Sequence, residues 1–398
     1  MIKRFSKYLV LVGIIFIVLI LLAWVTSPDP KLNMASFEDK PVTERIAPLD
    51  EAVTLAQYRD ENGKIVTFQV LSFSEKTVTG IDLSELGASN IEDPFAALSS
   101  VSAEAVTAET VPGFPTIEVA FSALLPSGPT GSQHIGTGTN FPEHAEEANS
   151  QSVFQFPKFG SATPTRTQVQ AKEGILLDYE VELCMRFDRD IKSAEDFELA
   201  VKGIFLCGDF TNRNALVTLA DPDNLDSGYG FSDAKSGSDS FPTGPFLVIP
   251  KDWESFVTQV HMTTAVNDEP RQDARGKEMT LNFKQLTTKA LKDMSKPRFL
   301  YQDKFHLLAE NNMIAADSTL MSGTSEGVIF TPPTRGDIIE GAWLYISRGG
   351  PFSETTLLNA VREKFIGNEL RSGHFLQSGD LVRHGSNYLG NIEINVVE

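Results

Sequence analysis

The chain has 398 residues, of which 41% are hydrophobic and 22% are charged, and its formal net charge is -19. This composition excludes a fibrous or disordered protein, and the length is sufficient for two globular domains. The charge argues against a nucleic-acid partner, because phosphate backbones are bound by surfaces rich in Lys and Arg. We therefore expect a small-molecule or protein partner.

The first 27 residues form a segment of their own. Lys3, Arg4 and Lys7 precede residues 8–25, which carry no charge. That run is long enough to cross a hydrocarbon core of roughly 30 Å, so residues 1–27 are predicted to be a transmembrane signal anchor. A cleaved signal peptide is the alternative, although its apolar core usually spans only about 7 to 15 residues. Because positive residues stay on the cytoplasmic side, the rest is expected outside the cytoplasm, in the periplasm of a bacterium or the lumen of a eukaryote.

Composition divides the remaining chain into three parts. Residues 28–50 hold several prolines among charged residues without periodicity, which is typical of a linker. Residues 51–130 show short apolar runs broken by turn signals such as Asn62-Gly63, and predict a small β-rich domain. A connector rich in Pro and Gly ends this domain, so residues 131–398 form a second, larger one.

The larger domain is predicted to be β-rich. Strand-like runs occur at residues 153–156, 175–187, 201–210, 246–249, 258–266 and 319–321. Helical patterns occur at residues 144–148, 194–200, 212–220 and 299–312. Because strands and helices do not alternate regularly, the pattern indicates an α+β fold and not a doubly wound sheet. Two long irregular insertions, near residues 221–240 and 331–373, interrupt it, the second with one helical pattern at 354–365; such segments often serve as lids or partner surfaces.

The two cysteines, Cys184 and Cys207, both lie in strand-like runs. An oxidising compartment permits a disulfide between them, but buried thiols that act as small hydrophobic groups are the commoner case, so we expect both to be free. The six histidines are scattered, and no Cys/His spacing resembles a zinc site. A metal in this chain is therefore expected to be bound by oxygen atoms.

Three carboxylates are the most informative feature of the sequence. Glu180 and Glu182 alternate with apolar residues in a strand-like run, so their side chains point to the same face. Asp209 follows the next strand-like run, which is apolar enough to be a neighbour of the first. A solvated acidic face is the alternative for a Glu-x-Glu pair alone. Three converging carboxylates instead suit a hard divalent cation, with Mg²⁺ expected first and Mn²⁺ or Ca²⁺ as alternatives.

Further residues suggest chemistry, each with a plainer alternative. His144 and Glu147 lie on one face of a short helix, where a carboxylate can orient an imidazole as a general base; an isolated surface pair is the alternative. Lys235 lies in a polar loop and could stabilise a developing enolate, although such a lysine is usually solvated.

Residues 323–327 match the G-x-S-x-G pattern, but Pro332 and Pro333 follow and disfavour the helix that a nucleophile elbow requires. Thr324 is instead expected to contact a substrate carboxylate.

These signals occur in an order that resembles the fumarylacetoacetate hydrolase family. The family pattern includes asparagine-aromatic-x-x-His-Ala-x-Glu, Asp-Tyr-Glu-x-Glu-Leu, a lysine loop that ends in Pro-x-Gly-Pro, and Gly-Thr-Pro-x-Gly-Val. The full family pattern has seven parts, and all seven have a counterpart in this chain, at residues 140–147, 178–183, 205–216, 235–245, 266–272, 323–328 and 389–396. The resemblance spans roughly residues 134–398, and the preceding region looks like the small β domain of longer members.

The resemblance implies a mixed β-sandwich roll for the larger domain and a set of roles. Glu180, Glu182 and Asp209 would hold the metal, while His144 with Glu147 would activate water. Lys235 would steady negative charge on the substrate, and Arg213 and Thr324 would bind it. The implied function is that of a metal-dependent hydrolase or lyase that cleaves a C–C bond in a small 1,3-dicarbonyl or 2-oxo acid. The resemblance also implies a homodimer. The alternatives are a 2-oxo-enoate hydratase or isomerase, an oxaloacetate decarboxylase, and a non-catalytic metal-binding scaffold.

The chain also departs from the family pattern. Its Asn-Asp pair is Gly208-Asp209, which keeps the ligand, but a glutamine that often faces substrate is replaced by Leu216. Asp239 lies one position later than the pattern expects, and Ser325 replaces the proline of the Gly-Thr-Pro turn. Because the residues that usually choose the substrate differ, we expect an unusual substrate.

Overall fold

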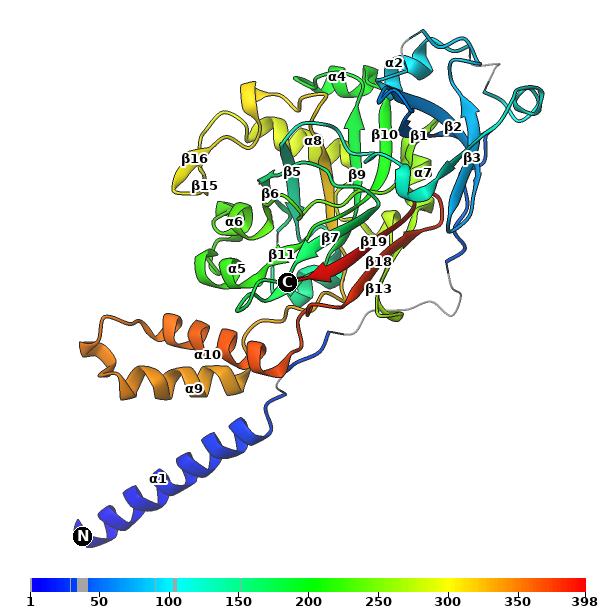
Figure 1. Ribbon diagram of the computed structural model, residues 1–398. Coiled ribbons are helices and arrows are strands. Elements are labelled where there is room, and N and C mark those ends of the chain that lie inside the picture. The colour runs from blue at the N-terminus through cyan, green and yellow to red at the C-terminus, as the bar shows by residue number, and fades with distance from the viewer. Residues whose placement is uncertain (1, 29, 34–41, 90, 103–105, 151) are drawn as a thin grey trace.

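The computed structural model of the chain describes residues 2–28, 30–33, 42–89, 91–102, 106–150 and 152–398 (Figure 1). Part of the predicted linker, residues 34–41, lies outside the described residues. The same holds for the side chains of residues 2–7, 9 and 10, which include the three basic groups of the predicted anchor.

The N-terminal helix α1 (Ile2–Val25) extends away from the body of the molecule, on the side of the helical hairpin formed by α9 (Arg335–Ser347) and α10 (Leu357–Ser372) (Figure 1). Its end is tied to α9, because Trp24 Nε1 donates a hydrogen bond to Glu340 Oε1 at 2.9 Å. Within the part of the chain that the structure describes, no helix combines the length and the apolarity needed to cross a membrane. The prediction of a transmembrane anchor is therefore not supported.

A long mixed sheet forms the centre of the molecule (Figure 1). Its strand order is β4 (Ile117–Ala120), β3 (Thr77–Asp82), β2 (Ile65–Phe73), β1 (Ala52–Arg59), β12 (Leu247–Pro250), β10 (Lys202–Gly208), β9 (Val181–Phe187), β17 (Leu320–Thr324), β5 (Gln133–Gly138) and β6 (Phe154–Phe159). The strands of the predicted N-terminal domain thus join the sheet of the larger domain, through antiparallel pairing of β1 with β12. The strands β9 and β10 are buried along their whole length, which agrees with their apolar character.

A second, five-stranded sheet packs against the centre of the first. Its order is β14 (Glu269–Arg275), β13 (His261–Val266), β18 (Leu381–Ser386), β19 (Gly390–Val397) and β7 (Arg166–Gln170). Strand β13 contacts β9, and strands β18 and β19 contact β10. Apolar side chains from both sheets, such as Leu183, Leu206, Met262 and Ile392, belong to one buried core. The predicted β-rich α+β fold is confirmed.

Helices and short strand pairs cover the edges of the sheets. The helices are α2 (Pro94–Ser99), α3 (Pro142–Glu147), α4 (Ala194–Leu199), α5 (Arg213–Leu219), α6 (Phe231–Lys235), α7 (Trp253–Gln259), α8 (Phe283–Lys292), α9 (Arg335–Ser347) and α10 (Leu357–Ser372). The short pairs are β8 (Leu177–Asp178) with β11 (Thr211–Asn212), and β15 (Phe299–Tyr301) with β16 (Lys304–His306). Ser193 caps α4, because its side chain accepts a hydrogen bond from the Asp196 amide.

Two predictions of local structure were wrong. Residues 299–312 do not form a helix, because Gln302 and Asp303 adopt positive φ angles of 49° and 62° and turn the chain into the β15–β16 hairpin. Residues 331–373 are not mostly irregular but contain the hairpin α9–α10, whose second helix overlaps the helical pattern predicted at 354–365. Thr334 and Asp337 form a capping box that starts α9, and Thr356 caps α10 through the Asn359 amide.

The prediction of free cysteines was also wrong. Cys184 and Cys207 form a disulfide, with their Cα atoms 6.0 Å apart. They lie on the adjacent antiparallel strands β9 and β10, where Cys184 is opposite Phe205, so the two cysteines are diagonal neighbours on one face. The strand pairing, which the sequence alone does not fix, brings the two sulfur atoms together.

Candidate active site

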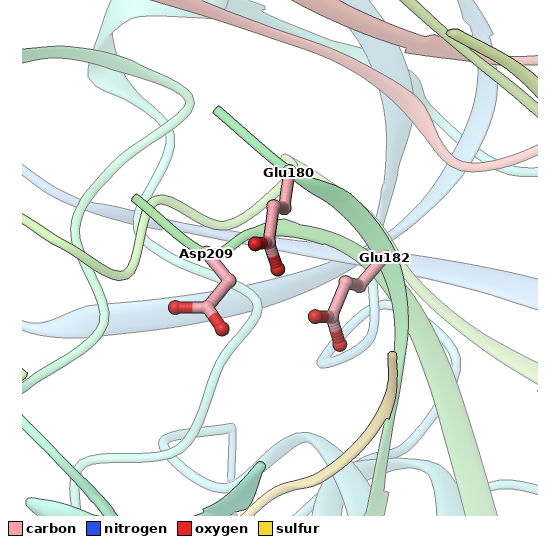
Figure 2. Close-up of side chains that lie close together, drawn as sticks. All are labelled: Glu180, Glu182 and Asp209. Atoms are coloured by element: carbon pink, nitrogen blue, oxygen red, sulfur yellow. The ribbon is translucent and has the colours of Figure 1, made fainter. Parts of the chain in front are cut away.

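The three predicted metal ligands converge at one end of β9 and β10. Glu182 lies in β9, Glu180 directly precedes it, and Asp209 directly follows β10. Because the strands pair antiparallel with Gly208 opposite Val181, their carboxylates meet (Figure 2). One oxygen atom from each carboxylate lies within 4.8 Å of the other two. The predicted convergence of the three side chains is therefore present in the fold.

The electrostatics of this cluster suit a hard cation. All three side chains are buried, and Oε1 of Glu182 has no hydrogen-bond partner among the residues that the structure describes. Burial and the neighbouring Asp209 and Glu180 raise the pKa of Glu182 well above its usual value. Burial acts the same way on Glu180, but Lys235 and Arg213 outweigh it and lower the pKa of Glu180 to about 2. An uncompensated buried carboxylate beside two others is the environment that a divalent cation neutralises.

Two buried cations contact this cluster directly. Lys235 Nζ lies 2.5 Å from Glu180 Oε2 and 3.0 Å from Asp209 Oδ2. Lys158 Nζ lies 2.6 Å from Asp209 Oδ1 and also donates to the backbone carbonyl of Lys235. Burial favours the neutral amine, but Asp209 and Glu180 outweigh it and raise the pKa of Lys235, so its side chain stays charged. The sequence predicted that Lys235 lies in a polar loop, but it lies at the end of the short helix α6.

Arg213 holds Glu180 from the other side. Its guanidinium donates to Asp178 Oδ2 and to Glu180 Oε1, at 2.8 Å in each case. Asp178 is itself held by the amides of Ile329 and Phe330, each at 3.0 Å. With Glu182 and Asp209 included, four carboxylates face the three cations Lys158, Lys235 and Arg213. With every group ionised, the described cluster thus has one negative charge in excess, which a divalent cation would reverse.

His144 and Glu147 form the predicted pair on α3. Nδ1 of His144 lies 3.2 Å from Glu147 Oε2, and both side chains are largely buried. The Gly327 amide donates to Glu147 Oε1 at 3.0 Å, which fixes the carboxylate. Because the carboxylate accepts from Nδ1, Nε2 of the imidazole is left to take a proton.

The segment 323–327 supplies backbone and side-chain contacts and is not a nucleophile elbow. Gly323 has a φ of 82°, and its amide donates to Glu182 Oε2 at 2.8 Å. Thr324 Oγ1 donates to the Val181 carbonyl and accepts from Gln272 Nε2, both at 2.9 Å. No helix starts between this segment and α9 at residue 335, so the strand-turn-helix geometry that a nucleophile elbow requires is not formed here.

A cavity of about 260 Å³ opens next to this cluster. Among the predicted residues, His144, Glu147, Glu180, Arg213, Lys235 and Thr324 line it. Sequence reasoning missed the role of Lys158, which lies on β6 far from the motifs. It also gave no role to Asp178 or Gln272, although both lie inside segments of the family pattern. The roles of the predicted residues stay predictions; their proximity is an observed feature of the fold.

Known proteins agree with this assignment at the level of family and fold. Residues 133–397 match the model of the fumarylacetoacetate (FAA) hydrolase C-terminal family. No curated protein matches the sequence.

Solved structures of low sequence identity share the fold. A fumarylacetoacetate hydrolase from Exiguobacterium antarcticum has a TM-score of 0.51 at 16% identity, covering 87% of this chain and 99% of its own. A 5-carboxymethyl-2-hydroxymuconate delta-isomerase from Mycobacterium smegmatis has a TM-score of 0.50 at 15% identity, covering 86% and 98%. A 2-hydroxyhepta-2,4-diene-1,7-dioate isomerase from Mycobacterium marinum has the same TM-score and identity, covering 87% and 98%. With the family match over residues 133–397, the chain belongs to the fumarylacetoacetate hydrolase family.

Proposed function

We propose that the protein is a divalent-metal-dependent hydrolase or lyase that cleaves the C–C bond beside a carbonyl in a small 1,3-dicarbonyl or 2-oxo acid. The observation that carries the proposal is the carboxylate cluster of Glu180, Glu182 and Asp209, whose Glu180 lines one cavity together with Lys235, His144 and Glu147. Family membership supports an enzyme of this general type.

In this proposal Glu180, Glu182 and Asp209 hold the cation, with Mg²⁺ as the first candidate. When bound, a divalent cation supplies Lewis-acid polarisation of a substrate carbonyl. Lys158 and Arg213 keep the carboxylates in place from behind, because each donates to one of them from a buried position. Such supporting contacts fix the orientation of ligands.

His144 is the general base of the proposed hydrolysis. Its Nε2 removes a proton from water, whose oxygen then bonds to the acyl carbon of the substrate. The bond between that carbon and the next breaks, and its electron pair forms an enolate, which Lys235 stabilises through its charge. The proton held on His144 passes to the enolate carbon. One water and one acylpyruvate thus yield a carboxylic acid and pyruvate.

The test is turnover of acylpyruvates and oxaloacetate by the full chain with Mg²⁺ or Mn²⁺, with products identified. Loss of a general base is expected to lower kcat by about 10²- to 10⁴-fold in His144→Ala. The matched control is His374→Ala, because His374 Nδ1 makes the same kind of contact with Glu369 Oε2, at 3.1 Å, away from the cavity. Turnover that is absent, or that does not depend on both metal and Glu182, would overturn the proposal.

A second candidate is an isomerase or hydratase acting on a 2-oxo-enoate. It is motivated by two structural neighbours with the same fold that carry isomerase names. An isomerase would use His144 to move a proton between carbons, and a hydratase would use it to add water across the C=C bond; neither adds water to an acyl group. Product analysis by NMR separates the candidates, because only hydrolysis yields two fragments. A scaffold without activity would bind metal but turn over neither substrate class.

Location and assembly are proposed separately. We propose that the larger domain acts outside the cytoplasm, and the Cys184–Cys207 disulfide supports this, because disulfides persist in oxidising compartments. Thiol alkylation in denaturant of protein from freshly lysed cells tests it, because both cysteines are buried in the folded chain: two reactive thiols without prior reduction would contradict it. The proposed homodimer rests on the family resemblance, and light scattering of the purified chain tests it.

A further inference from the structure

The cavity has a polar end and a long apolar wall. The polar end holds Glu180, Lys235 and Thr324, which belong to the proposed reaction site. Beyond it, apolar side chains dominate the lining, among them Phe154, Leu216, Leu225, Phe330, Leu358 and Val361. A substrate that placed only a short polar head at the reaction site would leave this wall in contact with water.

The wall begins one helical turn from the reaction site. Arg213 and Leu216 are three residues apart on α5, so they lie on one face of the helix, and both side chains are buried. The family pattern has a glutamine at position 216, which would offer a polar contact. Here Leu216 lines the cavity and adds apolar surface at this position.

The opposite part of the wall comes from the insertion at residues 331–373. On α10, Leu358 and Val361 are three residues apart and both line the cavity. The helix is fixed there, because Arg362 donates to the Ala220 carbonyl at 2.9 Å and the ring of Phe365 lies 5.9 Å from that of Phe330. In Figure 1, α10 follows α9 as one arm of a hairpin below α5. The apolar wall is therefore a fixed part of this fold.

Beyond the reaction site the wall is mostly apolar. Arg362 is the one cationic side chain there among the described lining residues, and part of its guanidinium is taken up by the hydrogen bond to the Ala220 carbonyl that fixes α10. Resting on the proposed function, we infer that the substrate is an oxo acid with an uncharged apolar tail of several carbons. The polar head binds at Lys235 and the tail lies between α5 and α10, so Leu216, Leu358 and Val361 determine specificity.

The experiment compares acetyl-, butanoyl-, hexanoyl- and octanoylpyruvate as substrates of the full chain with Mg²⁺. Each methylene that enters the cavity is expected to raise kcat/KM by about fourfold until the cavity is filled. Calorimetry with 2-oxo acids of matching lengths measures the same preference as Kd, without needing turnover. Succinylpyruvate, which ends in a carboxylate, is expected to be a poorer substrate than an uncharged homologue of similar length.

A matched pair of variants tests the wall itself. Leu357 and Leu358 are neighbours at the start of α10, and each is 48% exposed, but only Leu358 lines the cavity. Leu358→Gln is expected to lower the ratio of kcat/KM for hexanoylpyruvate to that for acetylpyruvate by about fivefold, whereas Leu357→Gln leaves this ratio unchanged. Because both positions are half-exposed, both variants should fold, and circular dichroism checks this.

The outcomes separate this inference from the proposed function. Turnover with kcat/KM and Kd that are flat or worsen with chain length, or a preference for succinylpyruvate, overturns the inference and leaves the reaction standing. Absence of turnover with 2-oxo acid affinity that still rises with chain length supports the inference and removes the reaction. If no 2-oxo acid binds in the presence of Mg²⁺, both are wrong.

Discussion

Replacement of Lys158 by methionine tests how the buried charges of the site support one another. The Lys158 ammonium is fully buried and donates to Asp209 Oδ1 at 2.6 Å and to the carbonyl of Ser240 at 3.2 Å. Methionine keeps the unbranched stem but removes the charge, so four buried carboxylates would face only two cations. Breaking a buried ion pair from one side typically costs roughly 3–5 kcal/mol, because the other charge stays buried without a partner. We expect a loss of that size in the free energy of unfolding.

The assay is urea unfolding of the full chain in EDTA, with Lys202→Met as the matched control. Lys202 is also buried on a strand. Its Nζ donates to the Glu198 carbonyl at 3.1 Å and lies 4.7 Å from the centre of the Phe197 ring, and among the described residues no buried carboxylate lies beside it. Saturating Mn²⁺ should recover part of the loss in Lys158→Met, since a bound cation stabilises the folded state. A loss below about 1 kcal/mol, or one equal to that of the control, would refute the reasoning.

Three further predictions concern the cross-link, pH and metal. Reduction of the disulfide, whose cysteines are 23 residues apart, should lower the free energy of unfolding by about 3 kcal/mol. Urea unfolding with and without a phosphine measures this loss, and a loss under about 1 kcal/mol would contradict the prediction. Burial lowers the pKa of His134 to about 4 and that of His384 to about 3. Above the unfolded pKa of about 6.5 neither state binds these protons, so the free energy of unfolding is at its full value there. By pH 5 only the unfolded chain takes up the protons, and the free energy of unfolding falls by roughly 2 kcal/mol per histidine. In His134→Gln the difference between pH 7.5 and pH 5 should shrink by about that amount, and an unchanged difference speaks against the assignment. Because the pKa of Glu182 is raised, protons compete with the metal for this carboxylate. The affinity for Mn²⁺, measured by calorimetry, should therefore weaken as the pH falls from 8 to 6. An affinity independent of pH would show that Glu182 is not a ligand.

The carboxylate cluster could be predicted because it depends on short-range rules. Alternation along a strand places Glu180 and Glu182 on one side, and Asp209 follows the next apolar run, which pairs with the first. The pair of His144 and Glu147 likewise follows from helical spacing on α3. In each case local periodicity or a simple neighbour rule positions the group.

The parts that failed depend on long-range pairing. Lys158 lies 51 residues before Asp209, and nothing local distinguishes its buried ammonium from a solvated lysine. The disulfide depends on the register of β9 with β10, in which Cys184 and Cys207 become diagonal neighbours. The β15–β16 hairpin depends on the positive φ of Gln302, a residue type with no strong turn preference. Tertiary contacts, which no single segment encodes, decide these features.

The central claim is that Glu180, Glu182 and Asp209 bind one divalent cation, and a calorimetric titration of the full chain with Mn²⁺ tests it most directly. We expect one ion per chain, with binding weakened by roughly 100-fold or more in Glu182→Gln, because the loss of even a supporting contact costs about 10- to 100-fold. Glu369→Gln is the control, since Glu369 is equally buried but contacts His374 outside the cluster. Absence of binding, or equal affinity in the wild-type chain and Glu182→Gln, would contradict the claim.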